Sequence, residues 1–138
     1  MNRSDFKEIA QIRLRDAKAL LKSGNYAGAY YLAGYAIECA LKACIAKQTR
    51  RYEFPPDRKT VEKLYTHDLV GLAKEAGLYA AIEAEGVLNK SFQENWKTVT
   101  SWKEGSRYEK HTRAEATDLY TAIADPVDGV FRWIEMYW

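Results

Sequence analysis

The stretch SGNYAGAYYLAGYAIECALKACIAK, residues 23–47, decides the fold class of this chain. It opens with a helix-breaking Gly24-Asn25 pair, and the following residues are apolar or small on nearly every face until Lys42. A helix of this composition, expected from about Tyr26 to Lys47, is buried on most sides and lies at the centre of a fold. Six small residues along it would let neighbouring helices approach closely: Ala29, Ala33, Gly34, Ala36, Ala40 and Ala43.

A second helix is predicted just before this stretch, from about Asp5 to Ser23, with Ser4 or Asp5 as its cap. The turn between the two helices is very short, so they should be antiparallel neighbours. Convincing strand patterns are missing from the sequence, and the chain is predicted to be all-α.

The second half of the chain predicts further helices. Residues 48–66 should be irregular because of Pro55-Pro56, and Thr66 should cap a short helix that ends at Gly77. A helical pattern then runs from Leu78 to Trp102 with a break at Gly86.

A last helix, in the part of the chain that carries Leu119 to Ile134, should be kinked at Pro126. The aromatic end FRWIEMYW, residues 131–138, either closes the core or forms a subunit interface. We therefore expect an up-and-down helical bundle of about four to five helices, in a single domain that spans residues 1–138.

The composition of the chain argues against several classes of function. The chain has 138 residues, 47% of them hydrophobic and 29% charged, and a net charge of +2, so only a local basic patch could argue for nucleic acid. The charged N-terminus and the lack of a long apolar run argue against a secretory signal or a membrane span, and favour a cytoplasmic protein. Cys39 and Cys44 face different sides of one predicted helix and are expected to be buried, reduced thiols.

The common nucleotide-loop, zinc-protease, CxxC and serine-hydrolase motifs do not occur in the sequence. The chain has only two histidines, His67 and His111, so we expect neither a metal site nor a cofactor. His67, at the start of a short helix, is expected to bond to backbone.

Glu38 is the one charge in the apolar part of the central helix, and a buried carboxylate there needs a partner. Arg13 or Arg15 of the preceding helix could form a structural ion pair with it. Alternatively, Glu38 lines a polar binding cleft.

The sharpest candidate for chemistry is SRYEKH, residues 106–111, which places Arg107 and His111 four residues apart. An arginine can hold a phosphate through two bonds, and a histidine can move a proton near neutral pH. A capping box beginning at Ser106 would put both side chains on one helical face, whereas one beginning at Thr112 would leave them before the helix. The sequence leaves these alternatives open.

Other residues near this pair suit a nucleic-acid ligand. Tyr108 could stack on a base, and three cations flank the pair in sequence: Lys103, Lys110 and Arg113. A plain solvated helix end is the competing interpretation.

The hairpin ALLKSGNYAGAYYLAGYAIECALKA, residues 19–43, first suggests a tetratricopeptide pair, but no 34-residue repeat follows. Together with HDL at 67–69 and RY at 107–108, it resembles the HEPN domain family over essentially the whole chain. These are small helical domains of prokaryotic nucleotidyltransferase partners and toxins. The resemblance implies a helical bundle that is usually a homodimer.

The resemblance also implies one of two roles. In the first, which we favour from the sequence, the protein is a dimeric binding partner of a small nucleotidyltransferase, a nucleotide or RNA in a toxin–antitoxin-like, two-component system. In the second, it is a metal-independent endoribonuclease in which Arg107 and His111 of two protomers meet in one cleft. The family's catalytic pattern has four to six residues between Arg and His, and this chain has three, Tyr108-Glu109-Lys110.

Overall fold

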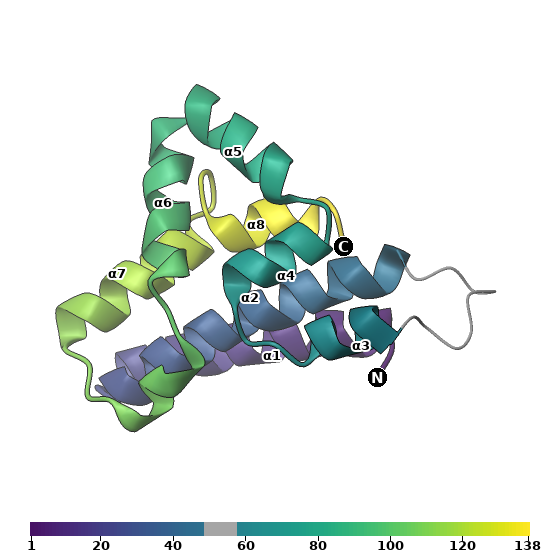
Figure 1. The fold of residues 1–138 in the computed structure, drawn as a ribbon. Helices are drawn as coiled ribbons and strands as arrows, with labels where there is room; N and C mark the ends of the chain where they lie inside the picture. The colour runs from purple at the N-terminus through teal and green to yellow at the C-terminus, as the bar shows by residue number, and fades with distance from the viewer. Residues whose placement is uncertain (49–57) are drawn as a thin grey trace.

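The structure is a computed structural model that describes residues 1–48 and 58–138. Within these ranges it contains eight α-helices and one 3-10 helix, η1, and no strand (Figure 1). The elements are α1 (Arg3–Lys22), α2 (Tyr26–Gln48), α3 (Arg58–Leu64), α4 (Leu69–Glu75), α5 (Tyr79–Leu88), α6 (Lys90–Thr100), η1 (Glu104–Tyr108), α7 (Arg113–Ala124) and α8 (Val130–Glu135). The predicted all-α bundle is confirmed. Its helices outnumber the four to five expected because two long predicted helices are each divided and because α3 forms in a stretch expected to be irregular.

The predicted hairpin is present as α1 and α2. Helix α1 starts two residues earlier than expected, because Asn2 and Asp5 cap each other's backbone, so the expected caps at Ser4 or Asp5 were wrong. After α1, Gly24 has a φ of +82°, a left-handed conformation that glycine adopts without strain. This turn sends α2 back along α1.

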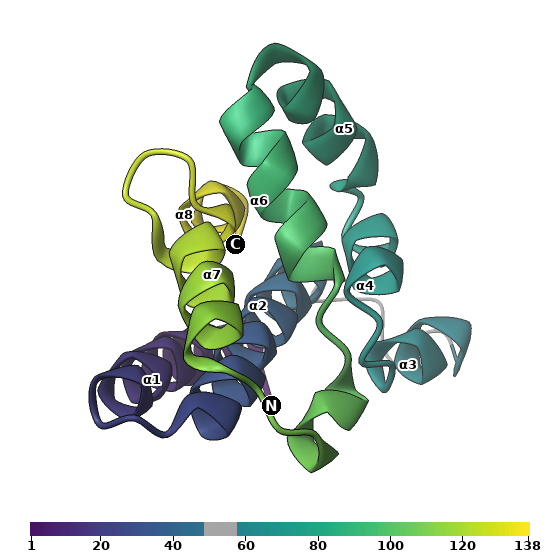
Figure 2. The same ribbon diagram turned by 90° about the vertical axis from the view of Figure 1, so that its left-hand side faces the viewer.

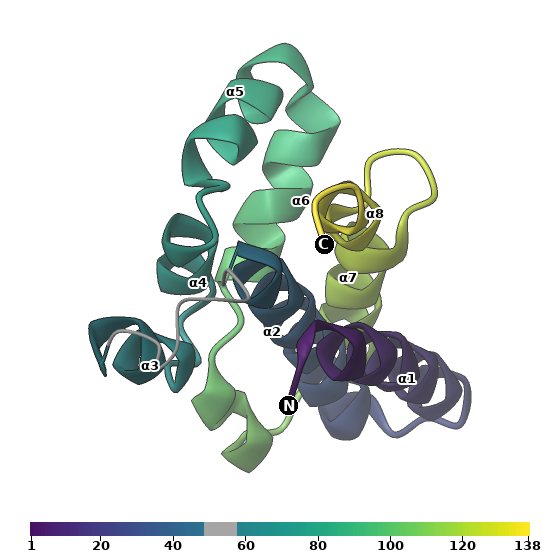
Figure 3. The ribbon, with the colours of Figure 1, turned by 90° about the vertical axis from the view of Figure 1, so that its right-hand side faces the viewer.

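Helix α2 is the centre of the fold, as its composition predicted. It packs against α1, α7 and α8 on one side and α4 on the other, and η1 also lies against it (Figure 3). Its small residues are buried, and so are the free thiols of Cys39 and Cys44, as expected. Burial raises the pKa of each thiol to about 11.

The segment before α4 differs from the prediction. Residues 58–64 form α3, where an Arg58–Glu62 ion pair at 3.4 Å joins successive turns of the helix. Pro55-Pro56 therefore did not make the whole of 48–66 irregular; the two prolines lie outside the described residues. Asp68 caps α4 through Val70 N–H, two residues after the predicted Thr66, and Gly77 ends the helix region with a φ of +71°.

Two breaks within predicted helices also differ from the prediction. Helices α5 and α6 meet at Asn89, whose side chain accepts from Phe92 N–H and caps α6, while Gly86 lies within α5. Pro126 does not merely kink the last helix, since α7 ends at Ala124 and α8 begins at Val130. The Asp125 carboxylate accepts from the backbone N–H groups of the next turn and stabilises the break.

The aromatic C-terminus closes the core of a single chain. Phe131, Trp133 and Trp138 are buried, and the Trp138 carbonyl accepts a hydrogen bond from the Arg3 guanidinium. Met136 and Tyr137 remain exposed. Within the described ranges, none of the helices combines the length and apolar character needed to cross a membrane.

Candidate functional site

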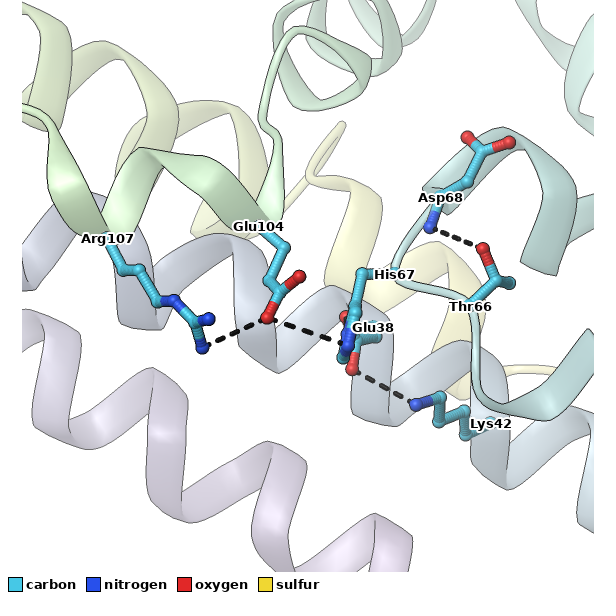
Figure 4. A network of polar contacts seen from close by, with 7 residues as sticks. All are labelled: Glu38, Lys42, Thr66, His67, Asp68, Glu104 and Arg107. Carbon is cyan, nitrogen blue, oxygen red and sulfur yellow. Dashed lines mark hydrogen bonds and ion pairs between the residues drawn. The ribbon is translucent and has the colours of Figure 1, made fainter.

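A line of polar side chains crosses the face of α2 near η1 (Figure 4). It starts at Glu38, which is only 1% exposed. One carboxylate oxygen lies 3.1 Å from Lys42 Nζ and the other lies 2.8 Å from His67 Nδ1. The buried charge is therefore compensated by a cation one turn away on α2 and by an imidazole from the loop before α4.

The line continues from His67 to η1. His67 Nε2 lies 3.6 Å from Glu104 Oε1, and the same Glu104 oxygen lies 3.0 Å from Arg107 Nη1. Figure 4 shows Arg107, Glu104, His67, Glu38 and Lys42 in this order. Arg107 is thus connected to the buried carboxylate of α2 through Glu104 and His67.

Local geometry presents His67 to Glu38. The Thr66 hydroxyl accepts from Asp68 N–H, and the Asp68 carboxylate in turn caps α4. His67 lies between these two residues, whose hydrogen bonds fix the backbone around it.

The position of η1 depends on Trp102, two residues before it. Trp102 is 1% exposed and stacks on Tyr31, with the ring centroids 6.1 Å apart. An ideal Cβ at Gly34 would come within 2.3 Å of the Trp102 ring, so this close approach requires glycine at that point of α2. Figure 2 shows η1, which joins α6 to α7 in the chain, at the lower edge of the molecule, and η1 contacts α2.

Arg107 is the exposed end of the line. Its side chain is 44% exposed, and its guanidinium lies over the Tyr108 ring, 4.7 Å from the centroid. Partial desolvation lowers the pKa of Arg107, but the Glu104 charge, with smaller contributions from Tyr108 and Tyr31, raises it above its ordinary value. Tyr108 is 80% exposed, so this cation and this ring form a surface pair.

His111 lies in a different environment. Its ring stacks on Tyr30 with centroids 3.7 Å apart and an angle of 12° between the planes. Nδ1 lies 2.9 Å from Glu115 Oε2, and Nε2 lies 3.7 Å from Glu109 Oε2 without a hydrogen-bond partner. The side chain is only 6% exposed.

The electrostatics of this second cluster agree with its geometry. Burial raises the pKa of Tyr30, and the charges of Glu115 and Glu109 raise it further. The hydrogen bond with His111, followed by that with Thr112, lowers the pKa of Glu115. His111 is therefore enclosed by its own segment and by α2.

The structure decides between the two capping alternatives. Thr112 caps α7 by accepting from Glu115 N–H, so Arg107 lies in η1 and His111 in the connection that follows. The two side chains do not share a helical face. Three predicted binding residues are exposed: Lys103 just before η1, Lys110 in the connection and Arg113 at the start of α7.

Two expected partners were wrong, although Glu38 does form the structural ion pair that was one of its alternatives. Glu38 bonds Lys42 and His67, whereas Arg13 of α1 pairs with Asp16 on its own helix at 2.8 Å. His67 uses both ring nitrogens toward carboxylates, where backbone partners were expected.

Sequence reasoning had named Glu38 and His67 but had not joined them. A lone carboxylate on an apolar face and a histidine at a helix start are complementary, and that signal could have paired them. Glu104 carried no comparable signal, because a glutamate that follows a lysine is typical of any loop.

Among the residues that the structure describes, no group of three or more His, Cys, Asp or Glu side chains is arranged to hold a metal ion.

Comparison with known proteins gives one match. No curated protein and no solved structure matches the chain. The model of the HEPN domain family matches residues 4–135, nearly the whole sequence. The chain therefore belongs to the HEPN domain family.

Proposed function

We propose that this HEPN protein is a dimeric binding partner, in a two-component, toxin–antitoxin-like system, of a nucleotide, RNA or a small nucleotidyltransferase. The observation that carries the proposal is the separation of Arg107 from His111. Arg107 is presented on the surface with Tyr108, whereas His111 is covered by Tyr30 and bonded to Glu115. This arrangement suits binding better than catalysis by the two residues within one chain.

The Arg107–Tyr108 pair supports a ligand that carries phosphates and bases. A guanidinium binds phosphate oxygens through parallel hydrogen bonds, and an exposed tyrosine offers a face on which a base can stack. Exposed cations before and after η1, at Lys103, Lys110 and Arg113, add positive charge, which attracts a polyanion. Glu38 supports this surface from behind through His67 and Glu104.

The experiment measures assembly and binding together. Light scattering after size exclusion should give the mass of a dimer, and a labelled RNA oligonucleotide should bind with an affinity that falls as salt increases. Arg107→Ala and Tyr108→Ala should each weaken binding about tenfold, which is the size of one lost charge-assisted contact or base stack.

Arg13 provides a matched control. Its side chain is 38% exposed and pairs with Asp16 three residues away, as Arg107 pairs with Glu104. Arg13→Ala should leave RNA binding unchanged. Equal losses from both arginine variants would show a nonspecific charge effect and would contradict the proposed surface.

A second candidate function is metal-independent RNA cleavage, and one observation favours it. His111 Nε2 is buried without a hydrogen-bond partner, so it can exchange a proton with RNA only if dimerisation or ligand binding uncovers it. In that reaction the 2′-hydroxyl loses its proton and its oxygen attacks phosphorus, the bond from phosphorus to the 5′-oxygen breaks, and that oxygen gains a proton. The histidine takes part in this proton transfer and Arg107 holds the phosphate.

Cleavage assays without metal separate the two functions. Cleavage by the unmodified protein that both Arg107→Ala and His111→Ala abolish would establish the ribonuclease. Cleavage that survives both substitutions would exclude this catalytic pair, and RNA binding by a folded dimer without cleavage would support the binding role.

A further inference from the structure

The Glu104 carboxylate lies in a place that suits another anion. One of its oxygens is 3.0 Å from Arg107 Nη1 and 3.6 Å from His67 Nε2, so a guanidinium and an imidazole converge on a single atom. Figure 4 shows the three side chains in line, with Glu104 in the middle. Two nitrogen-bearing groups from separate elements, η1 and the loop before α4, therefore define an anion position.

The back of this position is fixed by the protein core. His67 Nδ1 lies 2.8 Å from the buried Glu38 carboxylate, which can only accept, so Nδ1 carries a proton. Nε2 is then the nitrogen directed at Glu104; it accepts in the neutral ring and donates to an anion when the ring is protonated. The 3.6 Å separation exceeds a hydrogen bond, so Glu104 does not satisfy this nitrogen.

The Glu104 side chain, which fills the anion position, can move away from it. The Glu104 side chain is 30% exposed and begins a five-residue 3-10 helix that has no side-chain cap. Its neighbour Gly105 has nothing within 4 Å of an ideal Cβ, so the chain beside Glu104 borders open space. Exposed ion pairs such as Glu104–Arg107 are weak, and a better anion can replace the carboxylate.

We propose that Arg107 and His67 form a binding site for the phosphate group of a nucleotide, and that Glu104 is an internal competitor that occupies the site until the nucleotide displaces it. The inference deepens the proposed nucleotide- or RNA-binding function and rests on it. It makes His67, rather than His111, the histidine that acts with Arg107.

Phosphate fits this position better than the carboxylate does. It has more oxygens, so one can engage the guanidinium and another can reach Nε2. A phosphate monoester with one proton can donate to a neutral Nε2, and a protonated His67 can donate to the dianion. Tyr108, under the guanidinium, is exposed where a base of the same nucleotide could stack.

The test uses adenosine 5′-monophosphate as the probe, with inorganic phosphate and adenosine as separate arms. Titration by calorimetry should show that Glu104→Gln binds the nucleotide about tenfold more tightly than the unmodified protein, because the amide no longer competes as an anion. Arg107→Ala should abolish binding in either background. Inorganic phosphate should bind more weakly than the nucleotide and should also bind more tightly to Glu104→Gln. The affinity for adenosine, which has no phosphate, should not depend on Glu104.

Asp16→Asn is the matched control, because it removes a carboxylate from the comparable Arg13–Asp16 pair on α1. It should leave nucleotide affinity unchanged. His67→Asn should remove the gain produced by Glu104→Gln, but this variant also deprives Glu38 of a partner and could unfold.

Proton NMR of the unmodified protein avoids this difficulty. The chain has two histidines, so the ring protons of His67 and His111 are readily distinguished by the His111→Gln spectrum. Adenosine monophosphate should shift the His67 signals and leave those of His111 nearly in place.

The outcomes separate this inference from the proposed function. Nucleotide binding that depends on Arg107 but is unchanged or weakened in Glu104→Gln would overturn the competitor role and leave the binding function standing. Absence of nucleotide binding even in a folded Glu104→Gln variant would overturn the phosphate site itself, whatever the RNA assays give. A tightened Glu104→Gln variant in a protein that binds no RNA would support the site as one for small nucleotides.

Discussion

The two histidines of this chain have similar partners in very different settings. Each ring nitrogen of each histidine lies near a carboxylate: Glu38 and Glu104 for His67, and Glu109 and Glu115 for His111. The carboxylates of His67 come from α2 and η1, which are distant in the sequence. Those of His111 come from its own segment, within four residues.

The two clusters differ in which partner is buried, the histidine or the carboxylate. His67 is 41% exposed but bonds a carboxylate that is 1% exposed, whereas the His111 side chain is 6% exposed and its Glu115 partner is 53% exposed. A buried carboxylate must keep its partners, while an exposed one is satisfied by water. The His67 cluster therefore holds separate elements together, and the His111 cluster orders one connection against α2.

The largest expected difference comes from removing one carboxylate charge in each cluster. Glu38→Gln should cost about 2–3 kcal/mol of unfolding free energy, because Lys42 and His67 lose a buried charged acceptor. Glu115→Gln, the matched control, should cost much less than Glu38→Gln, since the Glu115 carboxylate is exposed to water. Urea denaturation with unchanged m-values measures both, and equal losses would contradict the comparison.

A smaller effect is expected at the contact that holds η1 near His67. Gly34→Ala should cost about 2 kcal/mol, because its new methyl group would collide with the Trp102 ring. Gly105→Ala, where the methyl group would enter open space, should change stability by less than about 0.5 kcal/mol. Thermal unfolding monitored by circular dichroism measures the pair, and a neutral Gly34→Ala would show that Trp102 can move at little cost.

The sequence predicted the elements that depend on local pattern. Tyr26–Gln48 was foreseen almost to the residue because its apolar composition and the preceding Gly24 leave few alternatives. The break at Asn89 was misplaced to Gly86, and the break after Asp125 was predicted only as a kink at Pro126, because side-chain caps, which are short-range but weak signals, decided both.

The composition of the candidate site could not be predicted from the sequence in the same way. Arg107, His111 and Glu38 were named from residue type, but which of them share a site depends on contacts between elements far apart in the chain. The i,i+4 spacing of Arg107 and His111 indicated a common face only if one helix contained both. Because the Thr112 cap starts α7 later, Arg107 joins Glu104 and His67, residues that spacing alone does not connect to it.

The next prediction concerns the stack in the His111 cluster. Tyr30→Leu should cost about 1 kcal/mol, because it removes an aromatic pair whose rings lie nearly parallel. Tyr108→Leu changes the same residue type at an exposed position and should be neutral for stability, within about 0.5 kcal/mol. Urea midpoints of the two variants give the comparison, and a loss at Tyr108 equal to that at Tyr30 would show that the Arg107–Tyr108 pair is structural.

The smallest expected effect is the acid dependence of the His111 cluster. The hydrogen bond with His111, and then that with Thr112, lowers the pKa of Glu115 below its ordinary value of 4.5. In the window below 4.5 the folded protein therefore binds fewer protons at this carboxylate than the unfolded chain does. The resulting contribution to stability is fully present above 4.5 and is lost as the pH falls through the folded-state pKa.

Glu115→Gln has no such carboxylate, so its stability should fall less steeply than that of the unmodified protein as the pH falls below 4.5. Asp125 serves as the comparison, because the pKa of its carboxyl is also lowered, but by the backbone N–H groups of Asp128 and Val127. His111→Gln should reduce the Glu115 contribution and leave that of Asp125 intact. If His111→Gln and the unmodified protein lose stability with the same slope in acid, the His111–Glu115 bond does not hold this loop in solution, and the order of His111 then rests on the Tyr30 stack alone.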